Sequence, residues 1–105
     1  MKKLLIIEDD LVVRENTQEI LELYDFEVVS AANGRIGIKL AQELLPDLII
    51  CDIMMPEIDG YAVLEAIAAD EKTAHIPFIF LSAKTEHKEI RRGMDLGADD
   101  YLTKP

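Results

Sequence analysis

The sequence predicts an α/β fold, in which a parallel sheet carries helices on both faces. Two observations predict this fold. First, short unbroken apolar runs alternate along the chain with segments whose apolar residues recur at helical spacing. Second, polar or charged residues follow directly after most of these runs. Such alternation is typical of right-handed strand–helix–strand crossovers, and it predicts that the site lies at the carboxyl ends of the strands.

Five strands are predicted. Residues 4–7, 48–51 and 78–81 are unbroken apolar runs, which is the pattern of strands that are buried on both faces. Residues 27–31 and 100–103 are weaker candidates, because their apolar content is lower. One strand therefore opens the chain, and each later strand follows a helical segment.

Four helices are predicted between the strands, from apolar residues at helical spacing. These residues are Val13, Thr17, Ile20 and Tyr24 in the first helix, Ile36, Leu40 and Leu44 in the second, Val63 and Ile67 in the third, and Ile90 and Met94 in the fourth. Residue types that are common at helix ends support the assignment. Asp10 and Asn33 are suited to cap the first two helices, Pro46 follows the second, Gly60 opens the third, and Gly97 stands where a C-terminal cap belongs.

Composition limits the function. The 105 residues suffice for one domain, residues 1–105, and no apolar run approaches the length of a membrane span. The formal net charge of −10 argues against direct nucleic-acid binding, because phosphates would repel the domain. The single cysteine, Cys51, cannot form an internal disulfide, which fits a reducing cytoplasm.

The residues at the predicted strand ends are the candidate site. They are Glu8 and Asp9 after the first strand, Asp52 after the third, Ser82 after the fourth and Lys104 after the fifth. Carboxylates that converge at one sheet edge repel one another, and a divalent cation relieves that repulsion. All-oxygen ligation suits Mg²⁺. A carboxylate beside Mg²⁺ can attack phosphorus, while Lys104 and Ser82 contact the phosphoryl oxygens.

Four motifs at these strand ends, in this order, resemble those of response-regulator receiver domains. The motifs are residues 4–10, residues 52–60, the pair Ser82-Ala83 and residues 97–105. The resemblance covers essentially the whole chain. It implies a flavodoxin-like, doubly wound five-stranded parallel sheet with strand order 2-1-3-4-5. It also implies a two-component or phosphorelay function, in which a histidine kinase or histidine phosphotransfer protein donates the phosphoryl group.

The resemblance assigns roles to individual residues. Asp52 is the phosphoacceptor and a ligand of Mg²⁺ or Mn²⁺. Asp9 is a direct metal ligand, Glu8 holds a metal-bound water, and the backbone carbonyl of Met54 completes the protein's ligand set. Lys104 contacts the phosphoryl group. After transfer, Ser82 moves toward the phosphoryl group and Tyr101 turns inward. The resemblance also implies a cis Lys104-Pro105 bond.

The role so implied is that of a switch, not of a turnover enzyme. Asp10 is expected to be a helix cap rather than a metal ligand. Lys88, Arg91 and Arg92 share one face of the fourth helix. This face is either a solvated surface or, with the fifth strand, an output face that forms a homodimer or docks an acidic partner.

The family normally adds a final helix beside the first, and this sequence ends at Pro105 without it. We therefore expect apolar sheet surface to be exposed next to the first helix.

Three other functions are weighed against the receiver. An aspartate-based phosphohydrolase places an acid two residues after its nucleophile, where this chain has Met54. A flavin-binding module needs a glycine- or hydroxyl-rich phosphate loop after the first strand, where this chain has acids. An interaction module that has lost phosphorylation is disfavoured, because every expected site residue is present.

Overall fold

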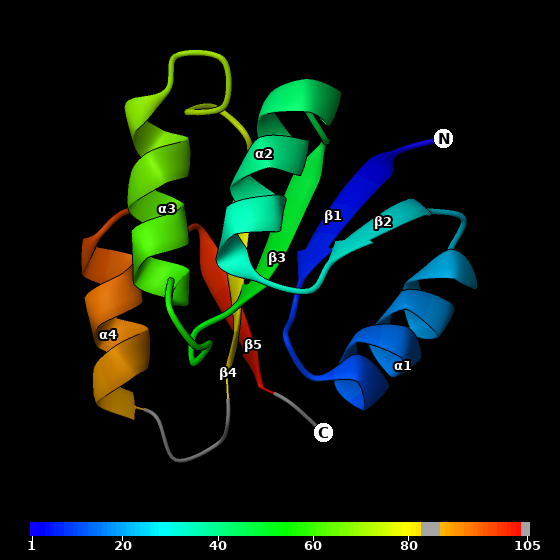
Figure 1. The fold of residues 1–105 in the computed structure, drawn as a ribbon, viewed down its shortest axis with the longest axis horizontal. Helices are drawn as coiled ribbons and strands as arrows, with labels where there is room; N and C mark the ends of the chain where they lie inside the picture. Colours follow the sequence, from blue (N-terminus) through cyan, green and yellow to red (C-terminus); the bar gives the residue numbers. More distant parts are fainter. Residues whose placement is uncertain (83–86, 104–105) are drawn as a thin grey trace.

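The computed structural model of this protein describes residues 1–82 and 87–103, the latter without the side chains of residues 87–90. Its elements follow in the order β1 (Lys3–Ile7), α1 (Leu11–Glu22), β2 (Glu27–Ala31), α2 (Gly34–Leu44), β3 (Leu48–Asp52), α3 (Gly60–Ala69), β4 (Phe78–Ser82), α4 (His87–Asp95) and β5 (Asp100–Thr103). The strands pair in parallel in the order β2-β1-β3-β4-β5 (Figure 1). The flavodoxin-like fold and its strand order are thus confirmed.

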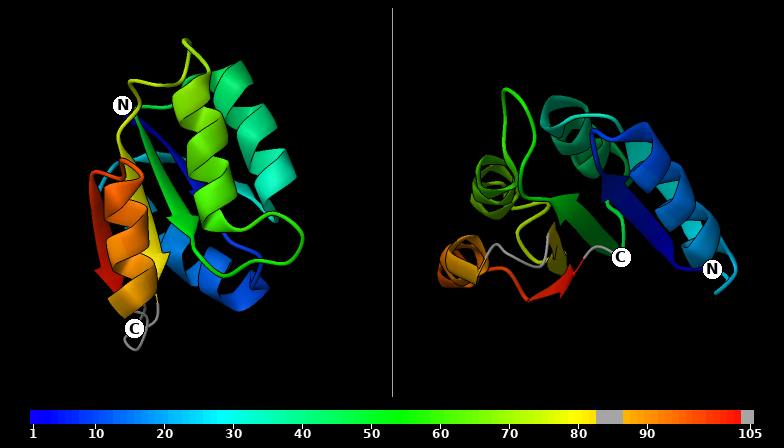
Figure 2. Two further views of the ribbon diagram at one scale, coloured as in Figure 1. Left: turned by 90° about the vertical axis from the view of Figure 1, so that its left-hand side faces the viewer. Right: turned by 90° about the horizontal axis from the view of Figure 1, so that it is seen from below.

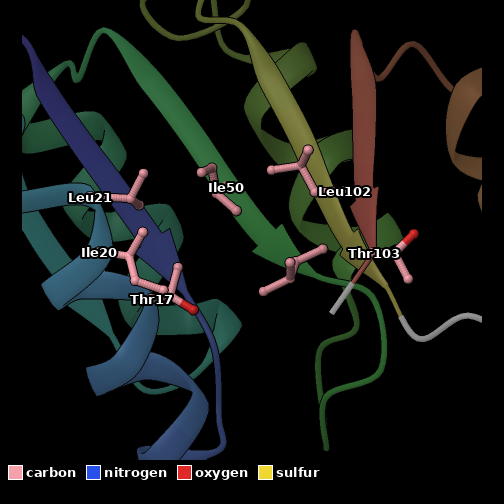
Figure 3. Close-up of a pocket in the computed structure, with 7 residues that line it drawn as sticks. Thr17, Ile20, Leu21, Ile50, Leu102 and Thr103 are labelled. Carbon is pink, nitrogen blue, oxygen red and sulfur yellow. The ribbon is translucent and has the colours of Figure 1, made fainter. Parts of the chain in front are cut away.

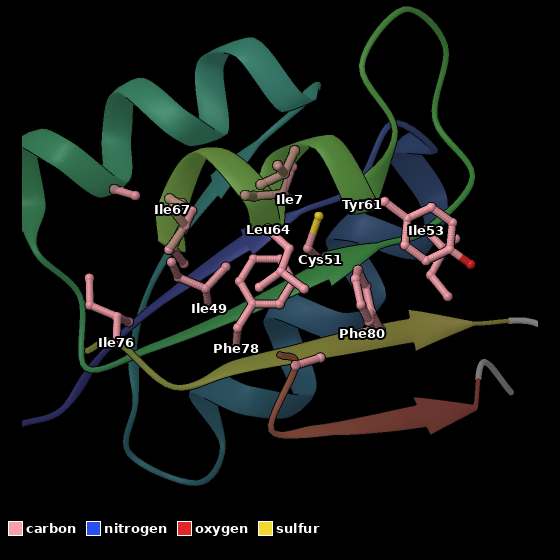
Figure 4. Close-up of a cluster of buried hydrophobic side chains, with 14 of the residues drawn as sticks. Ile7, Ile49, Cys51, Ile53, Tyr61, Leu64, Ile67, Ile76, Phe78 and Phe80 are labelled. Carbon is pink, nitrogen blue, oxygen red and sulfur yellow. The ribbon is translucent and has the colours of Figure 1, made fainter. Parts of the chain in front are cut away.

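The sheet separates two apolar layers, because successive strand residues point to opposite faces. On one face, Ile7, Ile49, Phe78 and Phe80 pack under α2 and α3 with Tyr61, Leu64 and other buried residues (Figure 4). On the other face, a smaller cluster of Leu4, Ile6, Ile50 and Leu81 packs against α1, which lies over β1 and β2 (Figure 2). Burial on both faces explains the unbroken apolar runs of β1, β3 and β4.

The predicted helix boundaries are largely confirmed. The side chain of Asp10 accepts hydrogen bonds from the first turn of α1, and that of Asn33 accepts one from Ile36 N at 2.9 Å. Gly60 is the first residue of α3. Gly97 has a φ of 109°, and hydrogen bonds from its own N–H and from Ala98 N close the end of α4. Among the described residues, no helix has the length and apolar content needed to cross a bilayer.

Among the described side chains, four predicted apolar positions are exposed rather than buried, and the first is Ile20 on α1, at 53%. Tyr24 lies beyond the end of α1 and is 73% exposed, because the chain leaves the helix for a turn in which Asp25 has a φ of 67°. Ile36 on α2 and Met94 on α4 are also partly exposed, at 44% and 38%. Ile90, the partner of Met94 in that pattern, has a side chain outside the described residues.

Glycines replace these residues at the core-facing positions of α2 and α4. A Cβ built on Gly37 would lie 2.4 Å from Cδ1 of Ile7, and one built on Gly93 would lie 2.3 Å from Cε2 of Phe80. Both helices therefore pack with their backbones close to the sheet, and larger side chains are displaced to the flanks. Apolar periodicity misses this arrangement because glycine carries no hydrophobic signal.

Between α1 and β5 lies an apolar groove of about 260 Å³ (Figure 3). Its walls come from α1, from the β3–β4 region and from β5, and it is lined by Thr17, Ile20, Leu21, Ile50, Leu81, Leu102 and Thr103. Ile20 and Leu102 are about half exposed there, at 53% and 48%.

Candidate functional site

Three acids meet at the carboxyl edge of the sheet, as the strand-end argument predicts. Ile7 of β1 pairs with Cys51 of β3, so that Glu8 and Asp52, the next residues of each strand, become neighbours. With Asp9, they present carboxylate oxygens that all lie within 4.8 Å of one another. Glu8 is fully buried and Asp52 is 3% exposed, whereas Asp9 is exposed. The cluster is thus half enclosed, with Asp9 on its open side.

Hydrogen bonds order the acidic loop between β1 and α1. The Glu8 N–H donates to the carbonyl of Ala31 at 3.1 Å, and the Arg14 Nη1 donates to the carbonyl of Glu8 at 2.8 Å. The Asp10 N–H donates to Oε2 of Glu8 at 3.3 Å. Asp10 itself accepts from the N–H groups of Val12 and Val13, which confirms it as the cap of α1. This capping use of its carboxylate explains why Asp10 is not part of the cluster.

The loop from β3 to α3 returns directly to the site. Met54, the second residue of this loop, has a side chain that is 60% exposed, and Glu57 turns the chain with a φ of 66°. The N–H of Gly60 then donates to the carbonyl of Ile53 at 2.8 Å, and Asp59 caps α3 by accepting from Ala62 N. The N-termini of α1 and α3 therefore both lie at the acidic edge, where their dipoles favour negative charge.

Ser82 ends β4 at the same edge, one position beyond the pairing of Leu81 with Asp52. Its side chain is fully buried, and its Oγ has no hydrogen-bond partner among the described residues. A buried hydroxyl without a hydrogen-bond partner is uncommon. This hydroxyl is well placed to donate a hydrogen bond to an oxygen atom of a ligand at the site. Lys104 and the Lys104-Pro105 bond lie outside the described residues.

Tyr101, the predicted switch residue, lies on β5 opposite Phe80 and is 42% exposed. Its side chain thus has solvent on one side, as both a switch residue before its inward turn and an ordinary half-exposed aromatic would have. The inward turn itself remains a prediction.

Cys51 precedes Asp52 but does not compete with it as a nucleophile. Burial raises the pKa of the Cys51 thiol well above its usual range, and the neighbouring carboxylates of Asp52 and Glu8 raise it further. The thiol is therefore protonated at neutral pH and acts as a packing residue, as its position in the core indicates.

Arg14 makes a contact with the acidic loop that the motifs did not reveal. It lies one turn after the cap Asp10, and its N–H donates to the carbonyl of that residue at 2.9 Å. A basic residue at this spacing from the acids is visible in the sequence, so its proximity to the acidic loop could have been anticipated.

The chain matches the family model described as "Response regulator receiver domain" over residues 4–105. It is 42% identical over its whole length to the DNA-binding dual master transcriptional regulator RpaA of Synechocystis, of which it spans 44%. The chain thus spans less than half the length of that relative.

Solved structures agree with this match. A response regulator from Chloroflexus aurantiacus is 35% identical and superposes with a TM-score of 0.94, over 99% of this chain and 85% of that one. The receiver domain of a sensor histidine kinase from Pseudomonas aeruginosa is 28% identical and superposes with a TM-score of 0.91, over 99% of this chain and 85% of that one. In that receiver domain a magnesium ion is coordinated in the active-site cleft.

Proposed function

The chain belongs to the response regulator receiver domain family, and from this we propose that Asp52 accepts a phosphoryl group in a Mg²⁺-dependent reaction. The cluster of Glu8, Asp9 and Asp52 within 4.8 Å is the observation that carries the proposal. Asp52 is the member best suited to be the acceptor, because it ends the central strand β3 between Glu8 and the end of β4, where Ser82 lies. Like Glu8, it is nearly or fully buried. Burial there removes competing water from the carboxylate.

The donor set fits a hard divalent cation. Its side chains offer oxygen atoms only, which Mg²⁺ and Mn²⁺ prefer, and Mg²⁺ keeps several waters beside one or two carboxylates. In our proposal Asp9 and Asp52 bind the cation directly, Glu8 holds a bound water, and the Met54 carbonyl completes the set. When bound, the cation supplies positive charge that offsets repulsion among the acids and the phosphoryl oxygens.

In the transfer step, a carboxylate oxygen of Asp52 forms a bond to phosphorus while the bond from phosphorus to the donor's imidazole nitrogen breaks. The donor is a phosphohistidine on a sensor histidine kinase or a histidine phosphotransfer protein. Ser82 donates its hydroxyl, which has no hydrogen-bond partner among the described residues, to a phosphoryl oxygen. Lys104, which follows the last residue of β5 in the sequence, neutralises charge on another phosphoryl oxygen.

The product is a switched state, and the domain is not a turnover enzyme. Phosphorylation adds a charge of about −1.5 to −2 at Asp52. That charge draws Ser82 and Lys104 inward and leaves room into which Tyr101 turns. A nearly complete switch needs on the order of 5.5 kcal/mol of differential stabilisation. Two or three charge-assisted hydrogen bonds in a shielded site supply much of this energy.

The output face that we propose is formed by α4 and β5. Arg91 and Arg92 are exposed on α4, and Asp100 is exposed at the start of β5. A face that carries both signs can pair with a second copy of itself. With a net charge of −10 the domain does not bind nucleic acid directly. We place its reaction in the cytoplasm, where a free thiol such as Cys51 stays reduced.

Charge reversal tests the dimer. Arg91→Glu is expected to lower self-association of the phosphorylated domain, because it places like charges opposite each other across the interface. Sedimentation velocity in the presence of acetyl phosphate and Mg²⁺ measures the self-association of the variant and of the wild type. Equal association of the variant and the wild type would argue for a solvated helix face instead.

The transfer itself is tested with acetyl phosphate, a small acyl phosphate donor. Intact mass is recorded after incubation with Mg²⁺ and after incubation with excess chelator. We expect a gain of one phosphoryl group with Mg²⁺ only, and loss of that group on treatment with hydroxylamine, which cleaves acyl phosphates but not serine phosphates. No gain with Mg²⁺ in a folded protein would favour a phosphorylation-independent interaction module.

A further inference from the structure

We propose that Arg14 is a positioning residue of the metal site, which holds the peptide unit between Glu8 and Asp9 and thereby aims both acids at the cation. The inference rests on the proposed function, because it concerns the same Mg²⁺. It assigns to an α1 residue a part in cation binding that the strand-end motifs do not contain.

The contact lies at the junction of the two acids. Nη1 of Arg14 donates to the carbonyl of Glu8 at 2.8 Å. That carbonyl shares its planar peptide unit with the N–H of Asp9. A rotation of this unit would therefore move the Asp9 carboxylate relative to Glu8. On the other side, the N–H of Glu8 donates to Ala31 at the end of β2. The Glu8 backbone is thus held from β2 and from α1 together.

Arg14 is itself well supported. Its N–H donates to the carbonyl of Asp10 at 2.9 Å, so it belongs to the first hydrogen-bonded turn of α1. The Asp10 side chain accepts from Val12 and Val13 and anchors that same turn. Arg14 is half-buried, unlike Glu15 and Asn16, which follow it and are exposed. A charged donor on a rigid support is the type of partner that orients metal ligands.

Geometry and charge make opposite predictions about this residue. A guanidinium near a cation site repels the cation, so on charge alone its removal would tighten Mg²⁺ binding. If Arg14 orients the ligands, its removal weakens binding in spite of the lost repulsion. Loss of a group that orients metal ligands typically lowers metal affinity by about 10-fold to 100-fold. The sign of the change therefore separates the two roles.

The test is a calorimetric titration of the phosphate-free protein with Mg²⁺ alone, at a temperature where each variant is folded. For Arg14→Met we expect the dissociation constant to rise about tenfold. The matched control is Lys72→Met, which removes the same charge from an exposed residue at the opposite edge of the sheet. We expect the control to leave the dissociation constant unchanged. If Arg14→Met does not fold, Arg14→Gln replaces it.

The outcomes are distinct. An unchanged or smaller dissociation constant for the Arg14 variant overturns the positioning role. A purely structural role would lower the free energy of unfolding without Mg²⁺ and leave the affinity of the folded protein unchanged, which also overturns it. If the wild type binds no Mg²⁺, the proposed function fails, and this inference fails with it. Binding by the wild type together with an unaffected Arg14 variant leaves the proposed function standing.

Discussion

Asp52→Asn is expected to abolish phosphoryl transfer from acetyl phosphate completely, while the protein stays folded. Asparagine has nearly the same shape as aspartate, so the end of β3 and the packing around it are preserved. Its amide oxygen is a poor nucleophile, because the amide is neutral and its lone pairs are delocalised. The substitution also removes one of the three clustered carboxylates, so Mg²⁺ binding is expected to weaken as well.

The matched control is Asp10→Asn. It makes the same change of charge two residues from Glu8, and asparagine caps a helix as well as aspartate does. We expect this variant to gain one phosphoryl group as the wild type does, as measured by intact mass. A phosphoryl gain on Asp52→Asn would show that another residue is the acceptor. Loss of the gain in both variants would show only that total charge near the cluster matters.

Gly60→Ala is expected to destabilise the fold by about 3 kcal/mol, the upper range for overpacking in a well-packed region. A Cβ at this position would lie 2.4 Å from the carbonyl oxygen of Asp52 and 2.8 Å from Cα of Ile53. Both atoms belong to the backbone at the end of β3, so neither can move without moving Asp52. We therefore also expect slower phosphoryl transfer in the fraction of this variant that is folded.

Gly34→Ala is its matched control, since Gly34 and Gly60 each open a helix directly after a capping side chain. Around Gly34 a Cβ would meet side-chain atoms of Val63 and Ile58, at 2.9 and 3.0 Å. Side chains can shift by a few tenths of an ångström more readily than strand backbone, so a smaller loss is expected. Urea unfolding of both variants measures the difference. Equal losses would mean that the backbone contact at Gly60 is not the limiting one.

The β strands and the composition of the site were predictable from the sequence because both depend on local pattern. Burial of both sheet faces makes β1, β3 and β4 continuously apolar, and chain topology brings the carboxyl ends of parallel strands to one edge. The meeting of Glu8 with Asp52 follows from these two facts together with the adjacency of β1 and β3, which the resemblance implied. The capping role of Asp10 was likewise visible, because a cap is a contact with residues two and three positions away.

The sequence could not predict in the same way which side of α2 and of α4 packs against the sheet. Ile36 and Met94 follow the helical period, yet Gly37 and Gly93 face the sheet instead. Apolar periodicity measures how much hydrophobic area a helix offers, but the distance of closest approach between helix and sheet is set by the smallest residues. That distance depends on Ile7 and Phe80, which lie far from these glycines in the sequence.

The sequence by itself therefore determined the fold class, the strand order through its resemblance, and the residue types at the strand ends. Only the tertiary structure decided how these residues are held: Arg14 on the Glu8 carbonyl, the Ser82 hydroxyl enclosed without a partner among the described residues, and Gly60 against the backbone of Asp52. The physical reason is that the spacing of apolar residues in the sequence indicates only which faces of the strands and helices become buried. Hydrogen bonds and close contacts depend on distances of a few ångströms, which are set when several elements pack together.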